Sequence, residues 1–175
     1  MDETFIFSLA PIIDSESRVL ILGSMPSRIS LAKQQYYGNP RNHFWRLLFQ
    51  IFDEPLEADY TKKTAFLLKH HLALWDVIHF CRREGSLDSA IHDEAVNAIP
   101  QLLQRYPNVR LIAFNGRKAQ DVFRKRTGQM NDLPMILLPS SSPMPGRNVK
   151  SYDQKFEIWK MLKTAAEEDS CDHFM

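Results

Sequence analysis

The segment RVLILGSMPS, residues 18–27, joins a short apolar run to a loop rich in serine and proline. Its first six residues suit a strand that is buried on both faces, as strands of parallel sheets are. Three more runs have the same character: LALWDV (72–77), VRLIAF (109–114) and PMILLP (134–139). The sequence therefore predicts a short central parallel sheet of about four strands.

Longer amphipathic stretches separate these runs, and NHFWRLLFQIF (42–52) places four apolar residues on one helical face. Similar patterns predict helices over residues 62–71, 94–106, 116–126 and 152–166. Pro100 requires the helix over 94–106 to be kinked or to start later. Because strands that alternate with helices pair in parallel through crossovers, we expect an α/β fold, a three-layer α/β/α sandwich.

The bulk properties indicate one compact domain. The 175 residues suit a single domain over 1–175, with a frayed acidic tail over 167–175. No apolar run approaches the ~20 residues of a membrane span, and the acidic N-terminus is unlike a signal peptide. Cys81 and Cys171 have no metal-binding or redox spacing. We therefore expect a cytoplasmic monomer with reduced thiols.

Several signatures of catalysis and cofactor binding are missing from the sequence. No GxGxxG follows a predicted strand, and GKS, GKT, GxSxG and HExxH patterns do not occur. These absences argue against a dinucleotide cofactor, a phosphate-binding loop, a serine nucleophile elbow and a zinc-protease site. The net charge of +1 argues against a protein that coats nucleic acid without specificity. We expect neither a cofactor nor a metal.

Polar or turn-forming residues follow all four predicted strands. Residues 23–27 follow the first strand, Asp76 closes the second, Asn115 follows the third and residues 140–142 follow the fourth. Open α/β sheets bind ligands in the crevice outside the carboxyl ends of their strands. The sequence therefore predicts a site at this edge of the sheet.

The loop over residues 23–45 is long enough to indicate a function. Tyr36 and Tyr37 precede the turn-forming Gly38-Asn39-Pro40. One interpretation is an aromatic ring presented for stacking on a flat ligand such as a base. The alternative is that both rings pack the loop onto the domain.

Three other features near the strand ends also allow two interpretations. Asn115 could bind a ligand through its amide, or it could cap the helix that follows. The loop LPSSSPMPGR (138–147) could hold a phosphate through N–H and hydroxyl donors, or it could be a rigid turn. The basic run over residues 117–126 could face phosphates, or it could be a solvated helix face.

Taken together, these motifs resemble the uracil-DNA glycosylase superfamily. GSMPS (23–27) and YYGNPRNHFW (36–45) precede LPSSSP (138–143) as in that superfamily. The resemblance is closest to its hypoxanthine (deoxyinosine) branch, whose other motifs match LWDVI (74–78), GSLDSAI (85–91) and FNGRKA (114–119). It covers roughly residues 18–160 and implies hydrolysis of the glycosidic bond of a deaminated base in double-stranded DNA.

The resemblance implies roles for individual residues. Asn115 and Asn42 match asparagines expected to be catalytic, whereas Met25 stands where mismatch-specific uracil glycosylases have a water-positioning asparagine. The ring of Tyr37, rather than its hydroxyl, is expected to stack on the extruded base. The branch often has histidine at the position of Asn39. The expected base-binding residues are Gly23, Ser24, Met25, Tyr37, Asn39 and Phe44.

The serine-proline loop is expected to enter the minor groove, with Met144 as the wedge and Arg147 near a phosphate. No lysine follows an apolar strand at the expected site, so we expect water to be the nucleophile and an abasic site to be the product. The expected DNA-binding residues are Ser140, Ser141, Ser142, Met144, Arg147, Arg117 and Lys118.

Three functions remain open from the sequence. The first is a monofunctional glycosylase for deaminated bases that prefers hypoxanthine, with xanthine and uracil as further candidate substrates. The second is a mismatch-specific uracil-DNA glycosylase, and Met25 counts against it. The third is a nucleic-acid-binding module of the same fold without catalytic activity.

Overall fold

The computed structural model describes residues 4–128, 130 and 132–169. Its main sheet has four parallel strands in the order β3-β2-β6-β7. The strands are β2 (Val19–Gly23), β3 (Leu72–Asp76), β6 (Leu111–Asn115) and β7 (Met135–Leu138). Each coincides to within one or two residues with a predicted apolar run, so the expected central sheet is confirmed.

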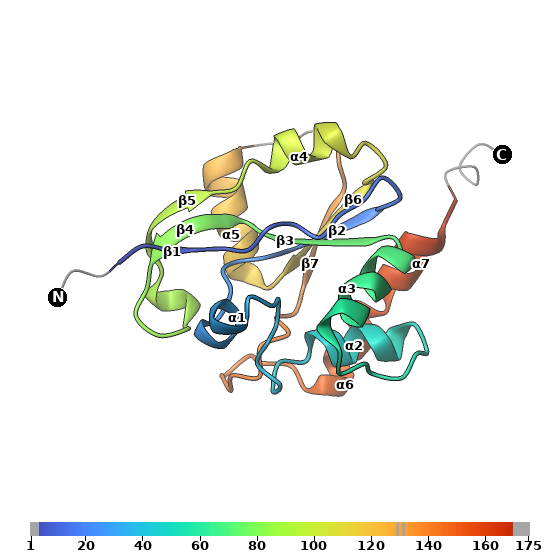
Figure 1. Ribbon diagram of the computed structural model, residues 1–175, viewed down its shortest axis with the longest axis horizontal. Helices are drawn as coiled ribbons and strands as arrows, with labels where there is room; N and C mark the ends of the chain where they lie inside the picture. Colours follow the sequence, from blue (N-terminus) through green and yellow to red (C-terminus); the bar gives the residue numbers. More distant parts are fainter. Residues whose placement is uncertain (1–3, 129, 131, 170–175) are drawn as a thin grey trace.

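Helices cover both faces of the main sheet (Figure 1). One face is covered by α4 (Ile99–Arg105) and α5 (Arg117–Thr127). The other is covered by α2 (Phe44–Ile51), α3 (Tyr60–Lys69), α6 (Tyr152–Trp159) and α7 (Met161–Glu167). Alternate residues of β2 enter the two cores, Val19 and Ile21 on the α2 side, Leu20 and Leu22 on the α5 side. The three-layer α/β/α sandwich is therefore confirmed.

A second, antiparallel sheet was not predicted. Its order is β1-β4-β5, formed by β1 (Ile6–Phe7), β4 (Ile78–Arg82) and β5 (His92–Val96). Of the two possibilities that Pro100 left for the helix over 94–106, the later start is confirmed: the helix begins at Ile99, and the residues before it pair with β4. Pro100 lies in the first turn of α4, where a missing N–H costs nothing.

Three further differences concern local structure. The expected long loop contains α1 (Arg28–Lys33), and the expected helix over 152–166 is divided into α6 and α7 at Lys160. Glu167 ends α7, and Asp169 pairs with Arg18 at 3.2 Å. The frayed acidic tail over residues 167–175 stays a prediction. Residues 170–175, Cys171 among them, lie outside the described residues.

Two other observations bear on the bulk predictions. Cys81 is a buried free thiol. No helix within the described ranges is both long and apolar enough to cross a membrane. The cytoplasmic location and the monomeric state stay predictions.

Candidate active site

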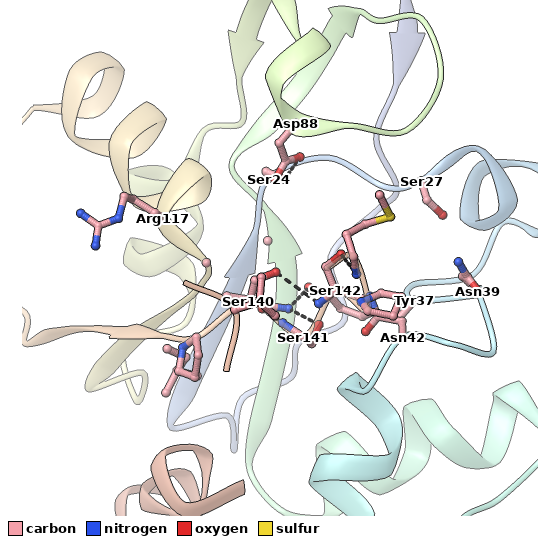
Figure 2. A pocket seen from close by; sticks show the side chains of 18 of the residues that line it. Ser24, Ser27, Tyr37, Asn39, Asn42, Asp88, Arg117, Ser140, Ser141 and Ser142 are labelled. Atoms are coloured by element: carbon pink, nitrogen blue, oxygen red, sulfur yellow. Dashed lines mark hydrogen bonds between the residues drawn. The ribbon is translucent and has the colours of Figure 1, made fainter. Parts of the chain in front are cut away.

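A pocket of about 870 Å³ lies at the carboxyl ends of the four parallel strands (Figure 2). Its volume falls in the range of small-molecule pockets. All four strand-end segments contribute to its wall. The structure brings together twelve of the predicted residues there: Gly23, Ser24, Met25, Tyr37, Asn39, Asn42, Asn115, Arg117, Ser140, Ser141, Ser142 and Met144.

Three predicted site residues do not line the pocket. Phe44 is completely buried, and its ring stacks on Tyr37 with centroids 3.9 Å apart and planes 16° apart. Its expected contact with a base is therefore wrong, since it lies in the core and supports the Tyr37 ring from behind. Lys118 is half-buried on α5, and Arg147 is exposed in the serine-proline loop outside the pocket wall.

The side chain of Asn115 connects two loops at the centre of the site. Its Nδ2 donates to the Tyr37 hydroxyl and to Ser141 Oγ, both at 2.8 Å. Its Oδ1 accepts from the Ser141 backbone N–H at 2.9 Å, which fixes the orientation of the amide because a backbone N–H can only donate. Asn115 does not cap α5, whose N-cap position is Gly116. The structure therefore contradicts the capping interpretation.

The two adjacent tyrosines have different roles in the structure. Tyr36 is 3% exposed, and its hydroxyl donates to the Ala10 carbonyl at 2.7 Å, so it packs the loop onto the domain. Tyr37 has a positive φ of 51° and lines the pocket. Burial raises the pKa of Tyr37 well above its usual value, so its hydroxyl is neutral.

Gly23 creates the space for two side chains on the pocket floor. A Cβ at this position would lie 2.5 Å from Asp76 Oδ1 and 2.8 Å from the Tyr37 hydroxyl oxygen. Neither distance permits a carbon atom, so any other residue would displace one of these groups. The glycine that ends β2 is therefore required by close packing.

Asn42 and Asn39 each use the side-chain oxygen to shape the chain. Asn42 Oδ1 accepts from the Phe44 backbone N–H at 2.9 Å, at the start of α2. Asn39 Oδ1 accepts from the Arg41 backbone N–H at 3.0 Å. For neither amide nitrogen does the described part of the chain offer a hydrogen-bond partner. Both residues therefore present free N–H donors at the pocket.

Ser141 holds the serine-proline loop in place and is only 1% exposed. In addition to its bonds with Asn115, its carbonyl accepts from the His43 backbone N–H at 3.0 Å. It is therefore poorly placed for the expected contact with DNA. Ser140 is exposed, Ser142 is half-buried and Met144 is 53% exposed, so this part of the loop is accessible to DNA.

A buried lysine supports the same loop. Lys155 is 1% exposed, and its Nζ donates to the Ser142 carbonyl at 2.9 Å and lies 3.2 Å from His43 Nδ1. Burial lowers the pKa of Lys155. Burial and the positive charges of Lys155 and Arg46 lower the pKa of His43. A neutral His43 ring can accept a hydrogen bond from the Lys155 ammonium through Nδ1. Lys155 therefore holds the serine-proline loop from inside the protein.

Two pocket carboxyls were not among the predicted site residues. Asp76 is 3% exposed, and Asp88 of the 3-10 helix η1 (Asp88–Ala90) accepts from Ser24 Oγ at 2.7 Å (Figure 2). Burial and the negative charge of Asp88 raise the pKa of Asp76 to about 7, although Arg83 lowers it. An aspartate that closes an apolar strand was the available signal in the sequence.

The described residues hold no group of three His, Cys, Asp or Glu side chains arranged to bind a metal ion. A metal-free reaction without a cofactor stays a prediction.

The sequence also matches known proteins. A model of the Uracil DNA glycosylase superfamily matches residues 10–163, which is most of the chain. This chain belongs to that superfamily. A superfamily structure from Methanosarcina acetivorans, solved by NMR as a candidate uracil DNA glycosylase, superposes with a TM-score of 0.77 at 37% identity. The superposition covers 94% of this chain and 100% of the other.

Two curated relatives in the superfamily carry the name hypoxanthine DNA glycosylase. The relative from Methanosarcina acetivorans is 42% identical over 147 residues, which cover 83% of this chain and 92% of the relative. The relative from Methanosarcina barkeri is 38% identical over 150 residues, which cover 85% and 92%. The resemblance to the hypoxanthine branch is therefore confirmed.

Proposed function

We propose that this chain is a DNA glycosylase that hydrolyses the glycosidic bond of deaminated bases in double-stranded DNA, with hypoxanthine preferred. The observation that carries the proposal is the pocket in which Asn115 fixes Tyr37 beside the free amide of Asn42. The identity of 42% and 38% to relatives called hypoxanthine DNA glycosylase supports the choice of base.

The reaction requires the damaged nucleotide to leave the helix, because its glycosidic bond is inaccessible within the base stack. The exposed thioether of Met144 is an apolar wedge that can fill the gap left in the duplex. Ser140 supplies a donor for a phosphate, and Lys150 lies in the pocket wall. Arg117 is exposed and points away from the labelled serines (Figure 2), so its guanidinium is accessible to a DNA phosphate outside the pocket.

The extruded base stacks on the ring of Tyr37, which Phe44 holds rigid from the opposite face. The free Nδ2 of Asn42 donates to the base or to the attacking water. Asn115 keeps a second lone pair on Oδ1, which can accept from that water. Bond cleavage develops positive charge on the sugar, as in other glycoside hydrolysis, and DNA phosphates stabilise it.

Water is the nucleophile in this proposal, and an abasic site is the product. Lys155 is the buried lysine of the pocket, and its ammonium already donates to the Ser142 carbonyl. Lys33 donates to the Gly38 carbonyl at 3.0 Å, and Lys118 does not line the pocket. A lysine that forms a Schiff base must instead be neutral and free to reach the sugar.

Two alternatives are tested with the same substrates. A mismatch-specific uracil glycosylase would need a polar group at Met25, whose side chain is 7% exposed and packs in the core. A binding module without catalytic activity would retain affinity for DNA and cleave nothing.

The test is incubation with matched duplexes that contain inosine, xanthine, uracil or no modified base, followed by alkali to break any abasic site. We expect alkali-dependent breaks, fastest with inosine. A double variant, Asn42→Ala with Asn115→Ala, purified in parallel, controls for contaminating enzymes. Faster cleavage of uracil would favour the second function, and no cleavage of any duplex would favour the third.

A further inference from the structure

Asp76 is a buried acid without a partner on the floor of the pocket. It is the last residue of β3, its side chain is 3% exposed, and it lines the pocket. Its Oδ2 is buried and has no hydrogen-bond partner among the residues that the structure describes. A buried polar atom without a partner costs free energy, so such an atom in a binding pocket indicates that a ligand satisfies it.

The surroundings of Asp76 favour the protonated carboxyl. Asp88 of η1 brings a second negative charge, whereas Arg83, after β4, brings a positive one. The Arg83 guanidinium donates to the Pro26 carbonyl at 2.6 Å and makes no hydrogen bond to Asp76. Tyr36 and Tyr37 face the same region as neutral hydroxyls. Burial and Asp88 together outweigh Arg83, so the pKa of Asp76 is raised to about 7.

We propose that Asp76 is a catalytic residue that acts as a neutral acid: it donates a hydrogen bond to the extruded base and transfers its proton as the base leaves. This inference rests on the proposed glycosylase function and adds to it the group that protonates the leaving base. It also gives a ligand, an acceptor atom of the base, to a pocket carboxyl that has no hydrogen-bond partner in the described part of the chain.

The proton and electron balance of this step is complete. The bond between C1′ of the sugar and the ring nitrogen breaks, and its electron pair passes to the base. Asp76 transfers its proton to a carbonyl oxygen or ring nitrogen of the base. Water adds to C1′, and the proton that it loses restores the acid form of Asp76.

The same donor contributes to specificity. Deamination replaces an amino group of the base, which donates hydrogen bonds, with a carbonyl, which accepts them. If the Asp76 O–H points at this substituent of the base, it donates a hydrogen bond to the carbonyl of the deaminated base. With the undamaged base, the O–H would meet an amino group, so two donors would face each other. A buried donor that is left unpaired costs free energy, so mispaired donors reject the wrong ligand.

The test measures single-turnover cleavage of an inosine duplex between about pH 5.5 and 8.5 for the wild type, Asp76→Asn and Asp88→Asn. We expect the wild-type rate to fall about tenfold per pH unit above the pKa of Asp76. Asp76→Asn keeps an N–H donor that does not titrate. The variant should therefore cleave more slowly than the wild type at pH 6, and its rate should not change with pH above pH 6. Asp88→Asn should keep the fall but move it to lower pH, because a negative neighbour is removed.

A second measurement does not depend on activity. Carbon-13 NMR of labelled aspartate carboxyls in the free protein, assigned with Asp76→Asn, should show Asp76 titrating near pH 7. Titration of Asp76 below about pH 5, or an unchanged fall of rate in Asp76→Asn, would overturn the inference and leave the glycosylase function standing. A wild type that cleaves no modified duplex would overturn both.

Discussion

The Asn115 amide nitrogen lies 2.8 Å from the Tyr37 hydroxyl oxygen and joins the end of β6 to the loop that carries the pocket ring. Tyr37 has a positive φ of 51°, a conformation that is strained for a tyrosine. The hydrogen bond from Asn115 and the stacking on Phe44 hold it there. The ring is therefore positioned before a base arrives, and binding does not have to order it.

Substitution of Asn115 by alanine should reduce single-turnover cleavage of an inosine duplex by roughly 10²–10³-fold and leave most of the DNA affinity. The variant loses both the free lone pair of Oδ1 and the anchor of Tyr37. Asn108→Ala is the control, because that exposed amide donates to the Ser15 carbonyl far from the pocket. If Asn115→Ala kept about a third of the wild-type rate, Asn115 would have only a structural role.

Asn42 can be tested with a substitution that separates its two functions. Asn42→Asp keeps the oxygen that accepts from the Phe44 N–H but removes the free amide donor. We expect Asn42→Asp to melt near the wild-type temperature and to cleave at least about tenfold more slowly. Asn42→Ala should lose both stability and rate. Full activity in Asn42→Asp would limit the residue to starting α2.

The structure changes the expectation for Tyr37→Phe. The sequence predicted that the hydroxyl is dispensable, but it accepts a hydrogen bond from Asn115. Its loss leaves one N–H of the half-buried Asn115 amide without its partner, which costs about 1 kcal/mol. Tyr37→Phe should therefore be less stable and slower, with near-normal affinity for lesion DNA.

Tyr37→Ala should also weaken the affinity for lesion DNA by ~1–3 kcal/mol, because the stacking surface is lost. Binding titrations and thermal melts distinguish the two effects.

Borohydride trapping tests whether a lysine attacks the sugar. We expect no covalent adduct with inosine or uracil DNA, because the Lys155 ammonium is held by the Ser142 carbonyl. Lys155→Met should reduce DNA affinity by loosening the loop, whereas Lys160→Met, an exposed neighbour on the next turn, should not. An adduct that disappears in Lys155→Met would show that the enzyme also forms a Schiff base.

Stability should respond to pH through Asp76. Its pKa is about 7 in the folded protein against a usual 3.8, so folding favours the protonated form. The wild type should therefore lose stability as the pH rises from about 4 through 7. Asp76→Asn removes this dependence and should be more stable than the wild type at pH 8.5 by roughly 2–4 kcal/mol. Urea unfolding at pH 5 and pH 8.5 measures the difference, and an equal effect at both pH values would contradict it.

The sequence predicted the main sheet well because its four strands are short, continuous apolar runs buried on both faces. It did not predict β4 and β5, because IHFCR and HDEAV mix polar and apolar residues and pair mainly with each other. Pairing between distant segments leaves little trace in local periodicity.

The site residues that follow predicted strands were found from the sequence, whereas those whose position depends on packing between distant segments were not. Strand-end residues such as Asn115 were found because the carboxyl ends of parallel strands always lie together. The burial of Lys155 was not foreseen, since it depends on how α6 packs against the serine-proline loop. Phe44 was assigned to the base by its motif, but its place in α2 turns it into the core.

Ser141 accepts from the His43 backbone N–H through its carbonyl and is held by Asn115 through its N–H and hydroxyl. The segment expected to hold the DNA backbone and the segment expected to hold the base are thus parts of one hydrogen-bonded unit. Affinities at two coupled sites are reciprocal. If abasic DNA strengthens retention of the excised base, the excised base must strengthen retention of abasic DNA by the same factor. Departure of the first product would then accelerate release of the second, and added free base would slow turnover.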